Sequence, residues 1–234
     1  MRGLFVTGTD TGVGKTVLSA ALLAAMAAEG ESVRAHKPVV TGLAEQRDGD
    51  ADGVWPADHE LLAAAAGMAP EDVAPLRFGP AVSPHLAAAI AGENVEPARL
   101  ILRAHAAGQA GTLIVEGVGG LLSPLAEDFT VCDLAAALGL PVLVAARPGL
   151  GTINHTLLTI RAARAAGLEV CAVVLTPWPR RSSVLERSNR ETIARMGEVE
   201  VGLLGRVRRP DPAVLARAGA GLPWRDWLGE RSGL

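Results

Sequence analysis

The sequence is poor in aromatic side chains and in cysteine. It has no tyrosine, three phenylalanines and four tryptophans in 234 residues, although 49% of the residues are hydrophobic. The apolar residues are therefore mainly Ala, Leu and Val, a composition that suits helices packed closely on a parallel sheet. Its two cysteines, Cys132 and Cys171, are far apart and do not form a metal-like pair. We expect buried thiols and a reducing, cytoplasmic location.

Long apolar runs and excess positive charge are also absent. No uninterrupted apolar stretch reaches the length of a membrane span, and the first apolar run begins too early for a signal peptide. A net charge of −3 provides no broad basic field for nucleic acid, and the basic cluster at 206–209 reads as a solvated loop. We therefore expect neither a membrane nor a nucleic-acid partner. The length predicts a single domain over residues 1–234.

A glycine-rich segment at 8–16 (Gly-Thr-Asp-Thr-Gly-Val-Gly-Lys-Thr) follows a short apolar run and precedes an Ala/Leu-rich stretch with helical periodicity. The order of strand, glycine-rich loop and helix is typical of a phosphate-binding P-loop, in which loop and helix N–H groups surround an anion. Lys15 is expected to neutralise the β- and γ-phosphates and Thr16 to bind Mg²⁺. The motif is one residue longer than usual, because five residues separate Gly8 from Gly14. An ordinary strand-to-helix turn is the alternative, which the flanking strand and helix disfavour.

The rest of the chain alternates between apolar runs and helical patterns. Strands are predicted near 3–7, 32–37, 111–115, 141–146, 170–175 and 199–204, and helices near 15–29, 130–138, 152–166 and 184–196. Continuous apolar strands indicate burial on both faces. The fold class is therefore α/β, with a P-loop NTPase-type, mostly parallel sheet and helices on both faces. Stretch 41–110, with shorter helices near 58–67, 84–91 and 96–108, is interpreted as an insertion over the strand ends, where such sheets bind ligands.

Other polar residues are predicted at the carboxyl ends of strands. Lys37 follows the second strand and could bind a transferring phosphoryl group or a carboxylate, or be a surface charge. Glu116 ends an apolar strand at a glycine-rich turn, which fits a second Mg²⁺ ligand, although it could also cap the turn. Asp58 could bind metal or act as an N-cap, and Asp50 and Asp52 compete for the metal role.

A further turn, at 149–155 (Gly-Leu-Gly-Thr-Ile-Asn-His), is predicted to present free N–H groups to an anion.

Five segments in the same order resemble dethiobiotin synthetases. They are residues 8–16, the Lys-Pro-Val of 37–39 with Thr41-Gly42, Ser83-Pro84-His85, Val-Glu-Gly-Val-Gly-Gly at 115–120, and Leu-Gly-Thr-Ile-Asn-His at 150–155. The resemblance implies an ATP-dependent enzyme of biotin synthesis that forms a cyclic urea from diaminopelargonic acid and carbon dioxide. It also implies Mg²⁺ as cofactor, ATP as co-substrate and a homodimer with the substrate site at its interface.

The resemblance also assigns roles to individual residues. It implies catalytic roles for Lys37, Lys15 and Thr11, and Mg²⁺ binding by Thr16, Asp58 and Glu116. The nucleotide-binding residues that it implies are Asp10, Thr11, Gly12, Val13, Gly14, Lys15, Thr16 and Thr176. For the diamine substrate it implies Thr41, Gly119, Gly151, Thr152 and Asn154, the last three reaching across the dimer interface to the substrate carboxylate.

The chain departs from the family where adenine is recognised. Members often carry an Asn-Asp pair after the strand that ends here at Leu175, whereas this chain has Thr176-Pro177-Trp178. Thr176 lacks the paired donor and acceptor of an amide, and Pro177 has no backbone donor. Selectivity for the nucleotide base is therefore expected to be weak.

The sequence leaves three further functions open. A partitioning or division ATPase of the same broad group would carry a lysine at the place of Asp10. A nucleotide-dependent switch would need neither Lys37 nor the turn at 150–155. Another P-loop amidoligase-like enzyme would share the loop and the acidic residues.

Overall fold

The computed structural model of the protein describes residues 1–44 and 55–230. Its centre is a six-stranded sheet in the order β10-β9-β8-β1-β5-β2, and every neighbouring pair in it is parallel. The strands are β1 (Gly3–Gly8), β2 (Val33–His36), β5 (Thr112–Glu116), β8 (Val142–Ala146), β9 (Val170–Trp178) and β10 (Glu200–Gly205). Each agrees with a predicted strand to within a few residues, which confirms the predicted α/β class.

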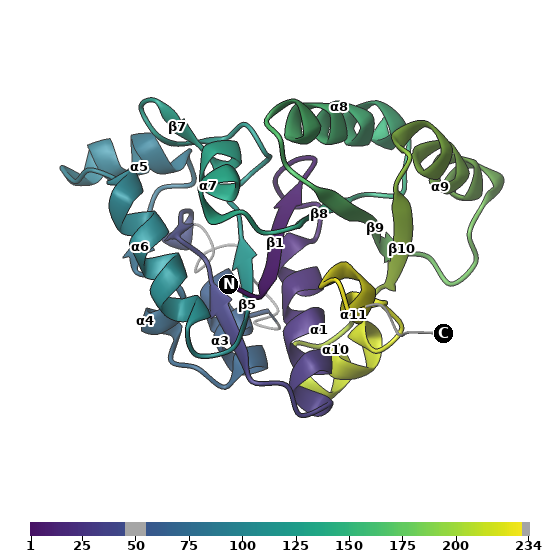
Figure 1. The fold of residues 1–234 in the computed structure, drawn as a ribbon, viewed down its shortest axis with the longest axis horizontal. Helices are drawn as coiled ribbons and strands as arrows, with labels where there is room; N and C mark the ends of the chain where they lie inside the picture. The colour runs from purple at the N-terminus through teal and green to yellow at the C-terminus, as the bar shows by residue number, and fades with distance from the viewer. Residues whose placement is uncertain (45–54, 231–234) are drawn as a thin grey trace.

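Helices cover both faces of this sheet (Figure 1). One face carries α1 (Lys15–Ala28), α3 (Asp58–Ala66), α10 (Pro212–Gly219) and α11 (Trp224–Trp227). The other carries α5 (Pro84–Ala91), α6 (Pro97–Gly108), α7 (Val131–Leu138), α8 (Thr152–Ala165) and α9 (Val184–Gly197). The short helix α4 (Pro70–Val73) contacts β2.

Side chains along each central strand alternate between the two cores. In β1, Leu4 and Val6 pack with α1, whereas Phe5 packs on the opposite face. Because successive side chains of a strand point to opposite faces, a strand buried on both sides must be apolar throughout. This explains the uninterrupted apolar runs in the sequence.

The short strands and the C-terminal helices were not predicted. β3 (Val39–Val40) pairs with β4 (Leu76–Arg77), and β6 (Pro124–Ala126) pairs with β7 (Phe129–Thr130). Helix α10 packs on α1 so closely that a Cβ on Gly219 would lie 2.2 Å from the carbonyl oxygen of Ala21. Glycine is therefore required at position 219. The contact joins residues 198 positions apart in the sequence, so the local sequence pattern could not reveal it.

The segment 41–110 divides between the sheet faces and the strand ends. Within its described part, α3 packs on α1 and β2, and α6 packs on β2 and β5. Thr41, Asp58 and residues 81–84 line a cavity at the carboxyl ends of the strands. No helix in the described part of the chain is long and apolar enough to cross a membrane.

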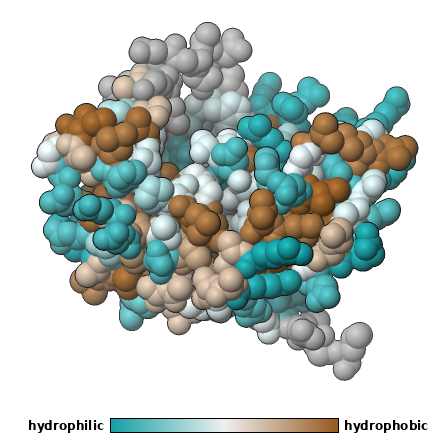
Figure 2. Space-filling model, turned by 90° about the horizontal axis from the view of Figure 1, so that it is seen from above, coloured by the Kyte–Doolittle hydropathy of each residue, from teal (hydrophilic) through white to brown (hydrophobic). Residues whose placement is uncertain are grey.

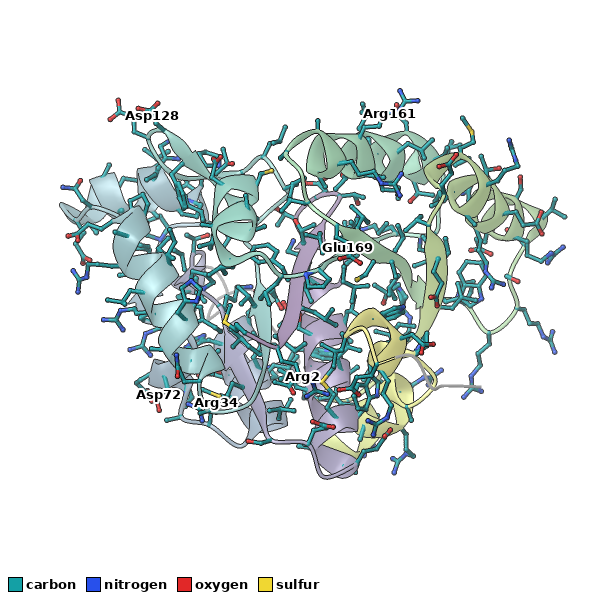
Figure 3. The ribbon with its side chains drawn as sticks, in the orientation of Figure 1. Arg2, Arg34, Asp72, Asp128, Arg161 and Glu169 are labelled. Carbon is teal, nitrogen blue, oxygen red and sulfur yellow. The ribbon has the colours of Figure 1, made fainter. Side chains whose placement is uncertain are left out.

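Ion pairs connect the N-terminal and C-terminal segments near the amino end of β1, whereas the cavity lies at the carboxyl ends of the strands. Arg2 pairs with Glu31 at 2.9 Å and with Glu230, and Arg225 pairs with Glu29 at 2.7 Å. Arg2 lies beside the C-terminal helices in Figure 3. Ion pairs between such exposed side chains contribute little to stability, so the C-terminal helices are held mainly by their apolar contacts with α1.

His36 should make stability depend on pH. Burial and the nearby charge of Arg103 lower the pKa of His36 from 6.5 to about 4, so it folds as the neutral form. Between pH 6.5 and pH 4, His36 is protonated in the unfolded chain but stays neutral in the folded protein. The free energy of unfolding should therefore fall by about 3 kcal/mol from pH 6.5 to pH 4. Denaturant unfolding of His36→Leu should lose that part of the pH dependence. If the free energy of unfolding of His36→Leu falls as steeply with decreasing pH as that of the wild type, His36 is not the cause.

Candidate functional site

The predicted phosphate-binding loop connects β1 to α1 as expected. Gly14 is the N-cap of α1 with φ +97°, and Gly12 has φ +69°, conformations that favour glycine. Asp10 is exposed, and its carboxylate accepts a 2.6 Å hydrogen bond from the N–H of Thr11. Val13 is buried in the core next to α1, so only its backbone could contact a nucleotide. The loop thus leads directly into the N-terminus of α1, where the helix dipole favours an anion.

Lys15 is held at this loop by main-chain carbonyls. Its ammonium donates to the carbonyl of Asp10 at 2.9 Å and to that of Gly119 at 2.7 Å. The side chain is buried, and desolvation, together with the charge of Lys37, holds the pKa of Lys15 below its ordinary value. A dianionic ligand at the loop would supply the negative charge that neutral carbonyls do not.

A second cluster forms where β2 and β5 end side by side. His36 of β2 pairs with Val115 of β5, so the next residue of each strand, Lys37 and Glu116, meet at the carboxyl end of the sheet. The Lys37 ammonium lies 2.6 Å from Glu116 Oε1 and also pairs with Asp58 Oδ2. Thr16 Oγ1 donates to the same Glu116 oxygen at 2.9 Å. The register of the sheet therefore brings Lys37 and Glu116 together, and α1 and α3 add Thr16 and Asp58, which the sequence had singled out separately.

The opposite charges of this cluster stabilise one another. Burial by itself would lower the pKa of Lys37, but Glu116 and Asp58 more than offset this and raise the pKa above its ordinary value. Desolvation would raise the pKa of Asp58, and Lys37 instead holds it below its usual range. Lys37 and Asp58 therefore each favour the charged form of the other.

Asp58 is not an N-cap. It is the first residue of α3, whose N-cap is Ala57, and Glu60 accepts the hydrogen bond from the Ala57 N–H at 3.0 Å. The Asp58 carboxylate is therefore free to pair with Lys37. Its two competitors in the sequence, Asp50 and Asp52, lie outside the described residues.

The oxygen atoms of the cluster fit a hard divalent cation. Glu116 is fully buried, and its Oε2 has no hydrogen-bond partner among the described residues. Carboxylates and hydroxyls are the ligands that Mg²⁺ prefers, and this ion usually keeps waters and phosphate oxygens as its other ligands. Within residues 1–44 and 55–230 no group of three acidic, His or Cys side chains gathers as a metal cluster. The donor set thus fits Mg²⁺ carried on a nucleotide better than an all-protein cage.

Both clusters open into one cavity of about 640 Å³. Of the residues predicted for the site, those lining it are Thr11, Gly12, Gly14, Lys15, Thr16, Lys37, Thr41, Asp58 and Gly119. Glu116 lies behind Lys37, and Thr176 lies against the loop, 2.9 Å from where a Cβ on Gly14 would be. Ala81, Val82 and Ser123 also line the cavity and were not singled out by the sequence, because nothing in their local pattern marks them.

The turn at 150–155 is not brought to this cavity within one chain. Gly151 is the N-cap of α8, the Thr152 hydroxyl lies 3.4 Å from that of Thr156, and Asn154 is exposed. Leu150 beside them is 92% exposed. Figure 2 shows further apolar surface on the side of the molecule that carries α8 and α9, where Leu158, Val184 and Leu185 are exposed.

Comparison with known proteins agrees with this geometry. A family model described as an AAA domain matches residues 2–212. An ATP-dependent dethiobiotin synthetase of Anaeromyxobacter sp. (strain Fw109-5) is 44% identical over 211 residues, covering 85% of this chain and 91% of that protein. The chain belongs to the dethiobiotin synthetase family. A synthetase of Mycobacterium avium (strain 104) is 39% identical and covers 97% of this chain and 98% of its own, and one of Bacillus subtilis (strain 168) is 34% identical and covers 86% and 85%.

Solved structures share the fold of this synthetase family at low sequence identity. A MinC:MinD cell division protein complex of Aquifex aeolicus aligns with a TM-score of 0.58 and 15% identity, over 100% of this chain and 98% of that chain. The apo McdA structure of Cyanthece aligns with a TM-score of 0.51 and 12% identity, over 97% and 95%. At these identities the likeness concerns the fold alone.

Removing Lys37 should destabilise the protein through Glu116. Lys37→Met leaves a buried carboxylate without its counter-charge, which typically costs about 3 kcal/mol or more. The double variant Lys37→Met/Glu116→Gln removes both charges and should recover a large part of that loss. Free energies of unfolding at pH 7 for both single variants and the double variant would measure the coupling. Simple additivity would show that the pair does not stabilise the fold.

Proposed function

We propose that this protein is an ATP-dependent dethiobiotin synthetase, which carboxylates diaminopelargonic acid and closes its ring. The observation that carries the proposal is a P-loop whose Lys15 and Thr16 share one cavity with Lys37 and its two carboxylates. A nucleotide switch has no use for a second buried lysine beside the phosphate loop. The family relationship supports the synthetase over a partitioning ATPase or a different amidoligase-like enzyme.

The proposed reaction has three steps. One amine of the diamine adds carbon dioxide and loses a proton to give a carbamate. A carbamate oxygen then attacks the γ-phosphorus of ATP, ADP leaves, and a carbamic-phosphoric anhydride forms. The second amine attacks the carbonyl carbon and loses a proton, the bond from that carbon to the phosphate oxygen breaks, and phosphate leaves with closure of the cyclic urea. No covalent enzyme intermediate is required, which agrees with a site built of cations and backbone donors.

The two lysines are proposed to stabilise the negative charge that develops in these steps. Lys15 is positioned for the β- and γ-phosphates, and Thr11 lies next to it at the mouth of the cavity. Lys37 now pairs with Glu116 and Asp58, and we assign it to the carbamate and transferring phosphoryl oxygens when a ligand is present. Holding both amines of one molecule close together makes ring closure intramolecular, which lowers its entropic cost.

Thr16, Asp58 and Glu116 are the residues that we assign to Mg²⁺. When bound with the nucleotide, the ion would neutralise charge on the phosphoryl oxygens. Asp10 to Thr16, with Thr176 against the loop, are assigned to the nucleotide. Thr41 and Gly119, which line the cavity, are assigned to the diamine.

A homodimer would complete the substrate site. Gly151 and Asn154 are exposed at the start of α8, outside the cavity, while the Thr152 side chain is buried between them. This turn can therefore serve a substrate tail only in another copy of the chain. The exposed Leu150 and the apolar surface near α8 and α9 fit burial in such an interface. A cytoplasmic location stays a prediction, consistent with the two free cysteines.

Phosphate release measured with and without the diamine and bicarbonate tests the proposed function. Turnover should depend strongly on both, and mass spectrometry should find dethiobiotin in an amount equal to the phosphate released. Equal turnover without the diamine would favour a nucleotide switch. Turnover with a different carboxylate-bearing substrate would favour another amidoligase.

Substitutions of Lys15 and Lys37 should have different effects on nucleotide binding and turnover. Lys15→Ala removes the cation at the loop, so both nucleotide affinity and turnover should fall. Lys37→Ala should bind nucleotide within a few-fold of the wild type and lose most of its turnover, because Lys37 pairs with carboxylates outside the phosphate loop and is assigned to the reacting groups. Calorimetry with a non-hydrolysable ATP analogue separates the two variants. Loss of nucleotide binding in folded Lys37→Ala would show that the roles are assigned wrongly.

Selectivity for the base should be weak. Thr176 and Pro177 offer no paired amide to adenine, and a single modest hydrogen bond is worth roughly tenfold. We therefore expect ATP to be preferred over CTP, GTP and UTP by no more than about tenfold in kcat/KM. Competition among the four nucleotides would measure this. A preference of several hundredfold would mean that another segment, such as the loop at 206–210, reads adenine.

A further inference from the structure

Ser123 closes the glycine-rich turn that follows β5 and Glu116. Its hydroxyl oxygen accepts a 2.9 Å hydrogen bond from the N–H of Gly120, and its own N–H donates to the Gly120 carbonyl at 3.1 Å. Its carbonyl accepts from the N–H of Val131 at 3.0 Å, which ties the turn to the first residue of α7. Ser123 is therefore the link between a loop at the cavity and the helical layer behind it.

This turn determines where Gly119 points. Gly119 has φ +67°, and a Cβ at this position would lie 2.4 Å from Ser123 Oγ, so Ser123 packs directly on it. The Gly119 carbonyl accepts the 2.7 Å hydrogen bond from the Lys15 ammonium. Thr11 Oγ1 lies 3.7 Å from the same Cβ position. Gly119 is thus fixed between Ser123 on one side and the phosphate loop on the other.

Lys15 depends on few partners. Only two carbonyls, of Asp10 and Gly119, accept hydrogen bonds from its ammonium among the described residues. Burial already lowers the pKa of Lys15, so a loss of one acceptor removes much of what compensates its desolvation. Ser123 itself lines the cavity, at the same end as Thr11, Gly119 and Lys15.

We propose that Ser123 is a positioning residue for Lys15. Its hydroxyl holds the Gly120 N–H, which aims the Gly119 carbonyl at the Lys15 ammonium and keeps this cation at the phosphate loop. The functional part of this proposal rests on the proposed function, because there Lys15 binds the phosphates of ATP. A replacement that keeps the hydroxyl should preserve the arrangement, and one that keeps only the shape should not.

Three substitutions separate the hydroxyl from the packing. Ser123→Thr keeps the hydroxyl, Ser123→Val has nearly the shape of threonine without it, and Ser123→Ala removes the hydroxyl without adding any atom. Lys15 and Lys37 are the only lysines of the sequence, so protein labelled with ¹⁵N-lysine gives two side-chain ammonium signals. The Lys37 signal serves as an internal control, since its partners are carboxylates outside this turn.

In Ser123→Ala and Ser123→Val the Lys15 signal should shift or broaden, and in Ser123→Thr it should stay near the wild-type position, with Lys37 unchanged throughout. The affinity for a magnesium complex of a non-hydrolysable ATP analogue should fall about three- to tenfold in the Ala and Val variants, the worth of one hydrogen bond. The KM for ATP should rise accordingly.

Two outcomes would overturn the proposal. One is an unchanged Lys15 signal and unchanged nucleotide affinity in folded Ser123→Ala. The other is an equal loss in all three variants, Thr included, with lowered melting temperatures, which would make Ser123 a packing residue only. If the wild type forms no dethiobiotin but the Lys15 signal responds as expected, the proposed function fails and the positioning role stands.

Discussion

The buried ion pair between Lys37 and Glu116 is the interaction on which the site depends. β2 and β5 are parallel neighbours, so their carboxyl ends coincide and one supplies an ammonium where the other supplies a carboxylate. Neither charge would be tolerated alone at such burial, because the desolvation of an unpaired ion costs several kcal/mol. The Thr16 hydroxyl donates to the same carboxylate and so connects the pair to the first turn of α1. The order of the strands thereby sets the geometry between the phosphate loop and the second lysine.

The two lysines of the cavity differ in what surrounds them. Lys15 is held by neutral carbonyls, and its pKa is lowered by burial, whereas Lys37 is held by carboxylates that raise its pKa. The repulsion between two like charges close together must be offset by separate partners for each. Lys15 is consequently short of negative charge, which an anionic phosphate would supply. Lys37 already has its counter-charges, and a divalent cation at Glu116 and Asp58 would compete for them.

The two helical layers serve different purposes around this centre. α1 and α10 pack so closely at Gly219 that there is no room for a Cβ, and this layer supports the helix that follows the phosphate loop. The opposite layer supplies α7, to which the turn containing Ser123 is hydrogen-bonded, and α8, whose first turn does not line the cavity. Apolar side chains left exposed beside α8, such as Leu150, are what a second copy of the chain would cover in the proposed dimer.

The sequence by itself determined the features that depend on neighbouring residues. The phosphate loop is a run of glycines between a strand and a helix, and the buried parallel strands are continuous apolar runs, so both were predicted with nearly their observed bounds. Lys37 and Glu116 could be singled out because each ends such a strand. Only the tertiary structure decided that these two side chains meet, that Asp58 pairs with Lys37 instead of capping α3, and that Ser123 supports Gly119. The helices after residue 205 and the short strand pairs likewise escaped prediction. Their stability comes from burial against residues distant in the chain, and such contacts leave no periodic signal in the local sequence.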